Sequence, residues 1–224
     1  MKQKASLKSP RISLTTEELS ELSAEDFRRV KLTTEEKARL REINLERDRE
    51  RVERSARLRT EEEPILADLR EAGLDVKSVW DLVNVSTPYP NAIPVLLKHL
   101  TWTYSDPIRE GIARALAVPD AREAWPLLVA EYRKAPSGEE NGLKLGAKSG
   151  LAAALSAICT DGVIEELVAL AKDRSHGNSR LLLLNALRKS KSAVAKKAIG
   201  ELASDPDLEK EIASWGTQVQ GKAK

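Results

Sequence analysis

Three stretches of eight residues decide how this chain is expected to fold: Arg109-Glu-Gly-Ile-Ala-Arg-Ala-Leu116, Lys148-Ser-Gly-Leu-Ala-Ala-Ala-Leu155 and Arg180-Leu-Leu-Leu-Leu-Asn-Ala-Leu187. They align without gaps on a basic residue, five further residues and a final Ala-Leu pair, at spacings of 39 and 32 residues. Their apolar residues recur at helical spacing, which predicts one face of an amphipathic helix. A motif that returns at a nearly fixed interval indicates a repeat architecture.

A second apolar stretch precedes each of these motifs and follows the last one, and its four copies also align: residues 92–97, 124–129, 163–168 and 194–199. Their spacings are 32, 39 and 31, so both alignments place about seven extra residues in the same interval. That interval contains Ala135-Pro-Ser-Gly-Glu-Glu-Asn-Gly142, a composition typical of a loop. The agreement predicts a series of helical hairpins.

The predicted fold class is all-α, an α-solenoid of stacked helical hairpins over residues 64–217. No window shows sustained alternation with β-branched residues, so no sheet is needed. One short hairpin cannot bury its apolar face alone, and neighbouring hairpins are therefore expected to cover it. The alanines of the motif would allow close helix approach and the leucines would fill the shared core: Ala115, Ala154, Ala186, Leu116, Leu155 and Leu187.

The first 63 residues differ in composition from the rest. They hold 16 of the 37 basic and 15 of the 35 acidic residues. We expect a flexible segment with short helices over residues 1–33 and a long charged helix over 34–62, because Thr33 and Glu36 form a capping pattern. A flexible tail is expected over 218–224.

The long charged helix carries half of a coiled-coil seam. Ala38, Leu45 and Val52 recur every seven residues, but Glu42 and Arg49 occupy the interleaved positions that a coiled coil needs apolar. Three interpretations remain open for residues 34–59. The helix is solvated and braced by its own ion pairs, it pairs with a partner helix or a second copy, or it is a basic arm for nucleic acid.

Overall composition narrows the class of protein. The net charge of +2 does not indicate a dominant attraction to polyanions, and the single cysteine, Cys159, excludes an internal disulfide framework. No secretory signal is apparent, and the longest uncharged runs are too short to cross a bilayer. We therefore expect a cytoplasmic protein that does not bind membranes.

A glycine series invites comparison with a phosphate-binding loop. Gly138, Gly142, Gly146 and Gly150 are spaced by four, and Lys148 stands between the last two. A phosphate loop needs four residues between its glycines and a glycine directly before the lysine, after a strand. Because these conditions are not met, a loop that leads into a closely packed helix is the better interpretation.

Candidates for catalysis or metal binding are few. His99, His176 and Cys159 are too few for a multi-ligand zinc site of histidine and cysteine, and each is expected to be a surface or packing residue. No acid–base constellation stands out. We expect no catalytic residues, no cofactor and no metal.

Aromatic residues form the more informative set of candidates. Five of them lie within 44 residues: Tyr89, Trp102, Tyr104, Trp125 and Tyr132. Trp102 and Tyr104 are expected in a turn between two helices. Two interpretations remain open. Either the five aromatic side chains pack between repeats, or they form an exposed patch that docks a partner peptide.

The hairpins resemble HEAT repeats. The motif that carries the resemblance is Asp-Pro-x-Arg-x5-Ala-Leu, present here as Asp106-Pro107-Ile108-Arg109 through Ala115-Leu116. The resemblance covers about residues 93–215, with residues 65–85 as a capping pair. It implies a ladder of aspartate and arginine that braces neighbouring hairpins, although Leu145 and Gly177 stand at the aspartate position of the later repeats.

This resemblance says little about function, because relatives range from scaffolds to a few enzymes. With no catalytic set in view, we expect a non-catalytic protein-binding module, that is a scaffold, adaptor or immunity-type inhibitor. The alternative is a nucleic-acid-binding protein similar to the HEAT-like alkylpurine DNA glycosylases, which use aromatic residues and an acid in a basic groove.

The charge distribution weighs against that alternative. The second helices would line the concave face with Glu110, Arg114, Ser149 and Asn185, and these rows are not basic. Positive charge is denser further along the chain, where a small patch for nucleic acid remains possible: Arg188, Lys189, Lys191, Lys196 and Lys197.

Overall fold

The computed structural model describes residues 13–22, 25–137 and 146–220, and within those ranges it contains helices and no strands. The all-α prediction is confirmed. The chain divides into two compact units, Met1–Arg57 and Leu58–Lys224. The division lies a few residues before the predicted start of the repeat domain at 64.

The first unit contains α1 (Thr16–Glu21), α2 (Asp26–Arg29) and the beginning of α3 (Thr34–Glu71). Helix α1 starts with the capping box expected from Thr15 and Glu18. The Glu36 side chain accepts hydrogen bonds from the Thr33 and Leu14 N–H groups, which ties α1 to the start of α3. The first twelve residues of the predicted flexible segment lie outside the described ranges.

Helix α3 corrects the predicted end of the long charged helix at residue 62. It continues to Glu71 and contains Pro64. A proline inside a helix costs about 3 kcal/mol, because its N–H is missing and its ring meets the preceding turn. Ile65 and Leu69 are completely buried just beyond it, so their packing offsets that cost.

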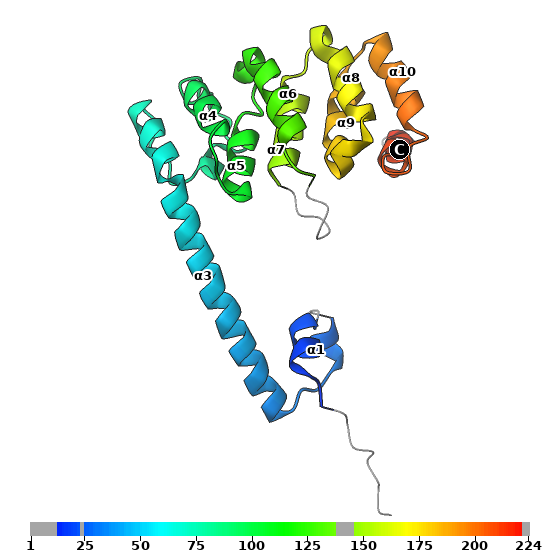
Figure 1. Ribbon diagram of the computed structural model, residues 1–224. Coiled ribbons are helices and arrows are strands. Elements are labelled where there is room, and N and C mark those ends of the chain that lie inside the picture. Colours follow the sequence, from blue (N-terminus) through cyan, green and yellow to red (C-terminus); the bar gives the residue numbers. More distant parts are fainter. Residues whose placement is uncertain (1–12, 23–24, 138–145, 221–224) are drawn as a thin grey trace, which may run out of the picture. The chain divides into compact units, whose positions relative to one another are not determined.

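The second unit contains two rows of helices (Figure 1). After the short 3-10 helix η1 (Val79–Leu82), one row consists of α4 (Ala92–Leu100), α6 (Trp125–Lys134), α8 (Ile164–Lys172) and α10 (Ala193–Leu202). The other row consists of α5 (Asp106–Ala115), α7 (Ala147–Ile158) and α9 (Arg180–Lys189). Helix α11 (Glu209–Gln220) follows, and it includes the start of the predicted flexible tail; residues 221–224 lie outside the described ranges.

Consecutive helices of the two rows pack as pairs, α4 on α5, α6 on α7 and α8 on α9, and α7 contacts both α5 and α9. The 3-10 segments η2 (Pro119–Ala124), η3 (Asp161–Val163) and η4 (Arg174–Ser179) lead into α6, α8 and α9. All seven aligned stretches of sequence are therefore helical. The predicted insertion falls between α6 and α7, where residues 138–145 lie outside the described ranges.

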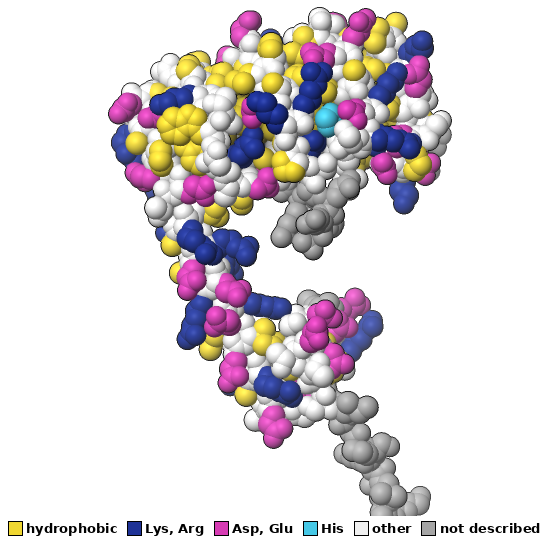
Figure 2. Space-filling model, viewed as in Figure 1, with side chains coloured by type: hydrophobic (Ala, Val, Ile, Leu, Met, Phe, Trp, Pro, Cys, Tyr) yellow, Lys and Arg dark blue, Asp and Glu magenta, His cyan; other side chains and the backbone are white. Residues whose placement is uncertain are grey.

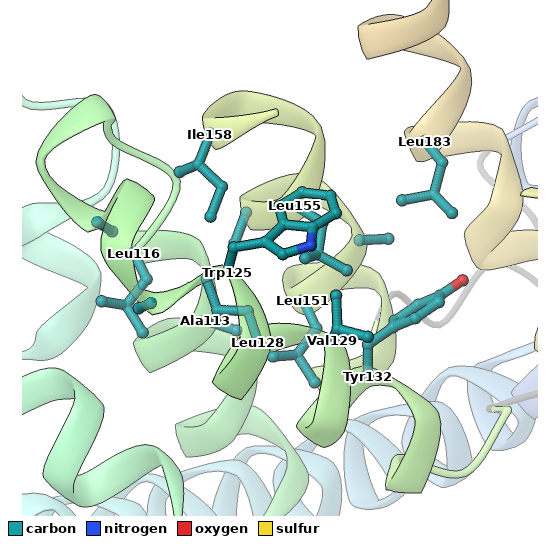
Figure 3. Close-up of a cluster of buried hydrophobic side chains, with 14 of the residues drawn as sticks. Ala113, Leu116, Trp125, Leu128, Val129, Tyr132, Leu151, Leu155, Ile158 and Leu183 are labelled. Carbon is teal, nitrogen blue, oxygen red and sulfur yellow. The ribbon is translucent and has the colours of Figure 1, made fainter. Parts of the chain in front are cut away.

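The repeated Ala-Leu pairs lie in the core. All six are buried: Ala115, Ala154, Ala186, Leu116, Leu155 and Leu187. Figure 3 shows how Leu116, Leu151 and Leu155 meet Trp125 and Leu128 between neighbouring helices. These contacts are what the repeated motif predicts.

Helices α5 and α7 approach closely because glycine stands at two positions, Gly146 just before α7 and Gly150 within it. A Cβ atom on Gly150 would lie 2.9 Å from the Glu110 carbonyl oxygen, and one on Gly146 would lie 2.5 Å from an Asp106 carboxylate oxygen. These two glycines serve helix packing, which agrees with the interpretation favoured over a phosphate loop. Gly138 and Gly142 lie outside the described residues.

Candidate functional site

A hydrogen-bonded chain of three side chains joins α3 to the turn between α4 and α5, with buried His99 between half-buried Asp68 and Tyr104. His99, which has no exposed surface, has Nε2 2.8 Å from Asp68 Oδ2 and Nδ1 2.7 Å from Tyr104 Oη. An ionised carboxylate only accepts hydrogen bonds, so in the neutral ring Nε2–H donates to Asp68 and the Tyr104 hydroxyl donates to Nδ1. Hydrogen bonds from Lys98 and His99 lower the pKa of Asp68, and burial raises the pKa of Tyr104.

Trp102 covers this chain on the solvent side. Its indole centroid lies 4.6 Å from the His99 ring and 6.4 Å from the Tyr104 ring, nearly parallel to the latter at 11°. The residue is nevertheless 47% exposed. Lys98 Nζ lies 5.3 Å from the indole centroid and 2.6 Å from Asp68 Oδ2. The result is an exposed aromatic plane beside a cation.

Both ends of this turn are attached to the last part of α3. Asp68 holds the His99 end, while Glu61 accepts hydrogen bonds from the Ser105 hydroxyl, at 2.7 Å, and from its backbone N–H. Two carboxylates on one helix therefore fix the geometry of the turn. We name the exposed surface formed by Lys98, Trp102 and Tyr104 the Trp102 surface.

The other three aromatic candidates are core residues, so the exposed-patch alternative does not apply to them. Tyr89, Trp125 and Tyr132 are buried. The Tyr89 hydroxyl donates to the Ala115 carbonyl oxygen at 2.8 Å, and Trp125 Nε1–H donates to Glu166 at 2.7 Å. Each hydrogen bond allows a polar aromatic group to pack inside the unit, so these residues follow the packing interpretation.

Trp80 is an exposed aromatic residue that is not among the five aromatic candidates predicted from the sequence. It lies on η1 and is 40% exposed. A Cβ atom on Gly111 of α5 would lie 2.9 Å from Trp80 Nε1, so the absence of a side chain there makes room for the indole. Trp80 is a matched comparison for Trp102 because the two residues are alike in type and exposure.

The basic residues of the repeated motif are interior or partly interior ties between helices. Arg109 donates to Glu131 of α6 at 3.0 Å, and Lys148 donates to the Ala135 carbonyl oxygen at 2.6 Å. Arg180 is fully buried and donates to Asp205 Oδ2 at 2.9 Å. The acceptor differs at each repeat, and the common feature is that the cation joins one helix to a neighbouring segment.

The predicted concave-face residues have different surroundings. Glu110 is buried and accepts a hydrogen bond from Arg114 Nε at 2.8 Å, so its charge is paired within α5. Arg114 and Ser149 are half-buried, and Asn185 is exposed. These four residues do not form one shared site: Glu110 and Arg114 pair within α5, whereas Ser149 and Asn185 lie on α7 and α9.

The basic patch near the end of α9 is exposed throughout: Arg188, Lys189, Lys191, Lys196 and Lys197. The Arg188 guanidinium lies over the Trp215 ring at 5.2 Å, and Lys197 is 3.9 Å from Glu201. Part of the positive charge is therefore paired within the chain.

The remaining titratable candidates are Cys159, which is half-buried, and His176, which is buried. Burial raises the pKa of Cys159 to about 11, so its sulfur is a thiol at neutral pH and not a reactive thiolate. His176 is buried against Tyr132, with ring centroids 4.5 Å apart, and burial lowers its pKa. Within the described ranges, no group of three or more His, Cys, Asp or Glu is arranged to hold a metal ion.

Comparisons with family models, curated proteins and solved structures return no match to this chain. The resemblance to HEAT repeats therefore rests on the motifs and their placement. In the parts of the chain that the structure describes, no helix combines the length and apolar character needed to cross a membrane.

Proposed function

We propose that this chain is a HEAT-type α-solenoid that binds a partner protein, as a scaffold, adaptor or inhibitor, and catalyses no reaction. The observation that carries the proposal is Trp102, a large aromatic side chain that is half exposed and packs against the rings of His99 and Tyr104, which are themselves joined by a hydrogen bond. Tryptophan is enriched among the residues that contribute most to binding between proteins.

The packing of the repeats supports the solenoid part of this proposal. The Asp106 carboxylate accepts a hydrogen bond, at 3.0 Å, from the Ala147 N–H at the start of α7, the second helix of the next hairpin. Arg109, three residues later, reaches Glu131 of that same hairpin. The HEAT resemblance implies an aspartate and an arginine that join neighbouring hairpins, and these two contacts support it.

The fixed geometry of Trp102 supports the binding part. A side chain already held in its bound orientation loses little conformational entropy on association, so more of its burial contributes to affinity. Lys98, beside the indole, supplies a cation. The partner we propose is a protein segment with an apolar side chain that covers the indole and a carboxylate that meets Lys98.

The test compares two tryptophans. A partner captured by the wild-type chain is purified, and its dissociation constant is measured by calorimetry for wild type, Trp102→Ala and Trp80→Ala. We expect Trp102→Ala to weaken binding by about 30-fold, the effect of a residue worth about 2 kcal/mol. Trp80→Ala should leave binding within about threefold. Equal affinity of wild type and Trp102→Ala would overturn the proposal.

Nucleic-acid binding is a second candidate, favoured by the five exposed basic residues between 188 and 197. Nucleic-acid binding is tested by a gel shift at two salt concentrations with the wild-type chain and a Lys196→Gln/Lys197→Gln variant. Salt-sensitive retention that the variant weakens would support this candidate. Release of a base from alkylated DNA would in addition support glycosylase activity.

A further inference from the structure

The segment of α3 within the first unit has two unlike faces. One is covered by the chain itself: Glu36 is buried and accepts a hydrogen bond from the Leu14 N–H, and Arg47 donates to the Ser20 carbonyl oxygen at 2.9 Å. The other face carries Leu45 and Val52, which are 59% and 65% exposed. In Figure 2 the surface of α3 is a mixture of positive and negative side chains with separate hydrophobic groups among them.

Helix geometry shows that these two faces are opposite. Residues seven apart differ by only about 20° around a helix, so Ala38, Leu45 and Val52 form one stripe. Glu36 and Arg47 lie about 160–180° around the helix from Leu45. The α1 helix therefore does not cover the stripe, which is the largest apolar feature on this part of α3.

We propose that the stripe pairs with the same stripe of a second copy of this chain, in antiparallel orientation, with Leu45 at the twofold axis. In this register Leu45 faces the partner's Leu45, and Ala38 faces the partner's Val52. By symmetry the contact between Ala38 and Val52 occurs twice, once on each side of the Leu45 pair. The two helices therefore stay at the same separation along the seam.

Charge complementarity selects this orientation. In the antiparallel register Glu42 lies near the partner's Arg49, and Arg41 lies near the partner's Asp48, and symmetry repeats both pairs. A parallel pair would instead place Glu42 against the partner's Glu42 and Arg49 against the partner's Arg49. Like charges at interleaved heptad positions oppose association. Glu42 and Arg49, which interrupt the seam, therefore oppose a parallel pair through like charges. In the antiparallel pair each of them lies near the opposite charge.

The seam contains only three apolar positions per chain, so the dimer belongs among weak, transient interfaces. Sedimentation equilibrium of the full chain over a wide concentration range should show a monomer–dimer equilibrium. Leu45→Asp/Val52→Asp should raise the dissociation constant at least about tenfold, because it places charges in the seam. A wild-type chain that stays monomeric at the highest concentration would overturn the proposal.

Disulfide cross-linking tests the orientation in a Cys159→Ser background. A mixture of Ala38→Cys and Val52→Cys chains, one of them tagged, should form mixed dimers, whereas neither variant should cross-link with itself. Leu45→Cys should cross-link with itself, and Glu50→Cys, exposed on another side of α3, should do so much more slowly. Self-cross-linking of Ala38→Cys without mixed dimers would contradict the antiparallel register.

Trp102→Ala should dimerise as wild type does, which separates this proposal from partner binding.

Discussion

At the scale of single residues, Arg180 shows how a charge is accommodated in the core. It lies at the start of α9 with no exposed surface, and its guanidinium donates to Asp205 and Asp207, each at 2.9 Å, and to the Ala171 carbonyl oxygen. A buried cation is tolerated only when its donors are satisfied. The side chain therefore joins α8, α9 and the segment before α11.

Replacement of Arg180 by methionine should be strongly destabilising. The change removes Arg180, the buried cation that donates to the buried Asp205 carboxylate. The loss of one partner from a buried ion pair typically costs about 3–5 kcal/mol. Arg174→Met is the control, since Arg174 also donates to Asp205, at 3.2 Å, but its side chain is 65% exposed. That change should cost less than about 1 kcal/mol. Urea denaturation measures both, and equal costs would contradict the role assigned to Arg180.

The same ion pair predicts how stability depends on pH. The hydrogen bond from Arg180 lowers the pKa of Asp205 from 3.8 to about 2. The folded state thus favours the ionised carboxylate, and this contribution is complete above about pH 4–5 and is lost as the pH falls toward 2. The urea midpoint should decrease over that range in wild type, and less steeply in Asp205→Asn. Parallel pH profiles for the two proteins would contradict the assignment.

The fate of individual side chains was only partly predictable. The sequence marks Trp102 and Tyr104 as residues of a turn, but it treats them as equivalent to Tyr89, Trp125 and Tyr132. What separates them is a tertiary contact: His99 meets Asp68, which is 31 residues earlier on another helix. No local pattern reveals such a pairing, so the Trp102 surface could not be assembled from the sequence alone.

At the scale of helices, the close approach of α5 and α7 depends on Gly150. Alanine normally stabilises a helix interior relative to glycine by about 1 kcal/mol. At Gly150 the added Cβ would meet the Glu110 carbonyl oxygen at 2.9 Å and the Ala113 Cβ at 3.1 Å, so the helices must separate. We expect Gly150→Ala to lower the free energy of unfolding by about 1–3 kcal/mol.

Gly200 in α10 provides the matched control for this change. A Cβ atom there would meet nothing within 4 Å. Gly200→Ala should therefore raise the free energy of unfolding by about 0.4–1 kcal/mol, through helix propensity and a less flexible unfolded chain. Thermal and urea unfolding of the two variants show whether their changes in the free energy of unfolding have opposite signs. A stabilising effect at both positions would contradict the close packing of α5 on α7.

Helix existence was predictable from the sequence, and helix ends were less so. Seven aligned stretches are helical because their apolar residues recur at a helical period, which is a local property. The predicted end at residue 62 is too early: α3 continues through Pro64, a residue that normally ends a helix, and the burial of Ile65 and Leu69 offsets its cost. Such tertiary compensation is invisible in a local pattern.

At the scale of the whole chain, the described buried residues are unevenly divided. Apart from Leu19 and Glu36, all of them lie after Leu58, in the second compact unit. A chain that begins at Leu58 should therefore fold cooperatively and melt within a few degrees of the full chain. Circular dichroism measures this, and loss of helical signal or of cooperativity would contradict the independence of the second unit.

The central claim is that a partner protein covers Trp102. Hydroxyl-radical footprinting of the full chain, free and bound to the captured partner, measures the oxidation of each tryptophan by mass spectrometry. If the partner covers Trp102, oxidation of Trp102 should fall several-fold in the complex while oxidation of Trp80 stays the same. Unchanged oxidation of Trp102 in a saturated complex would contradict it.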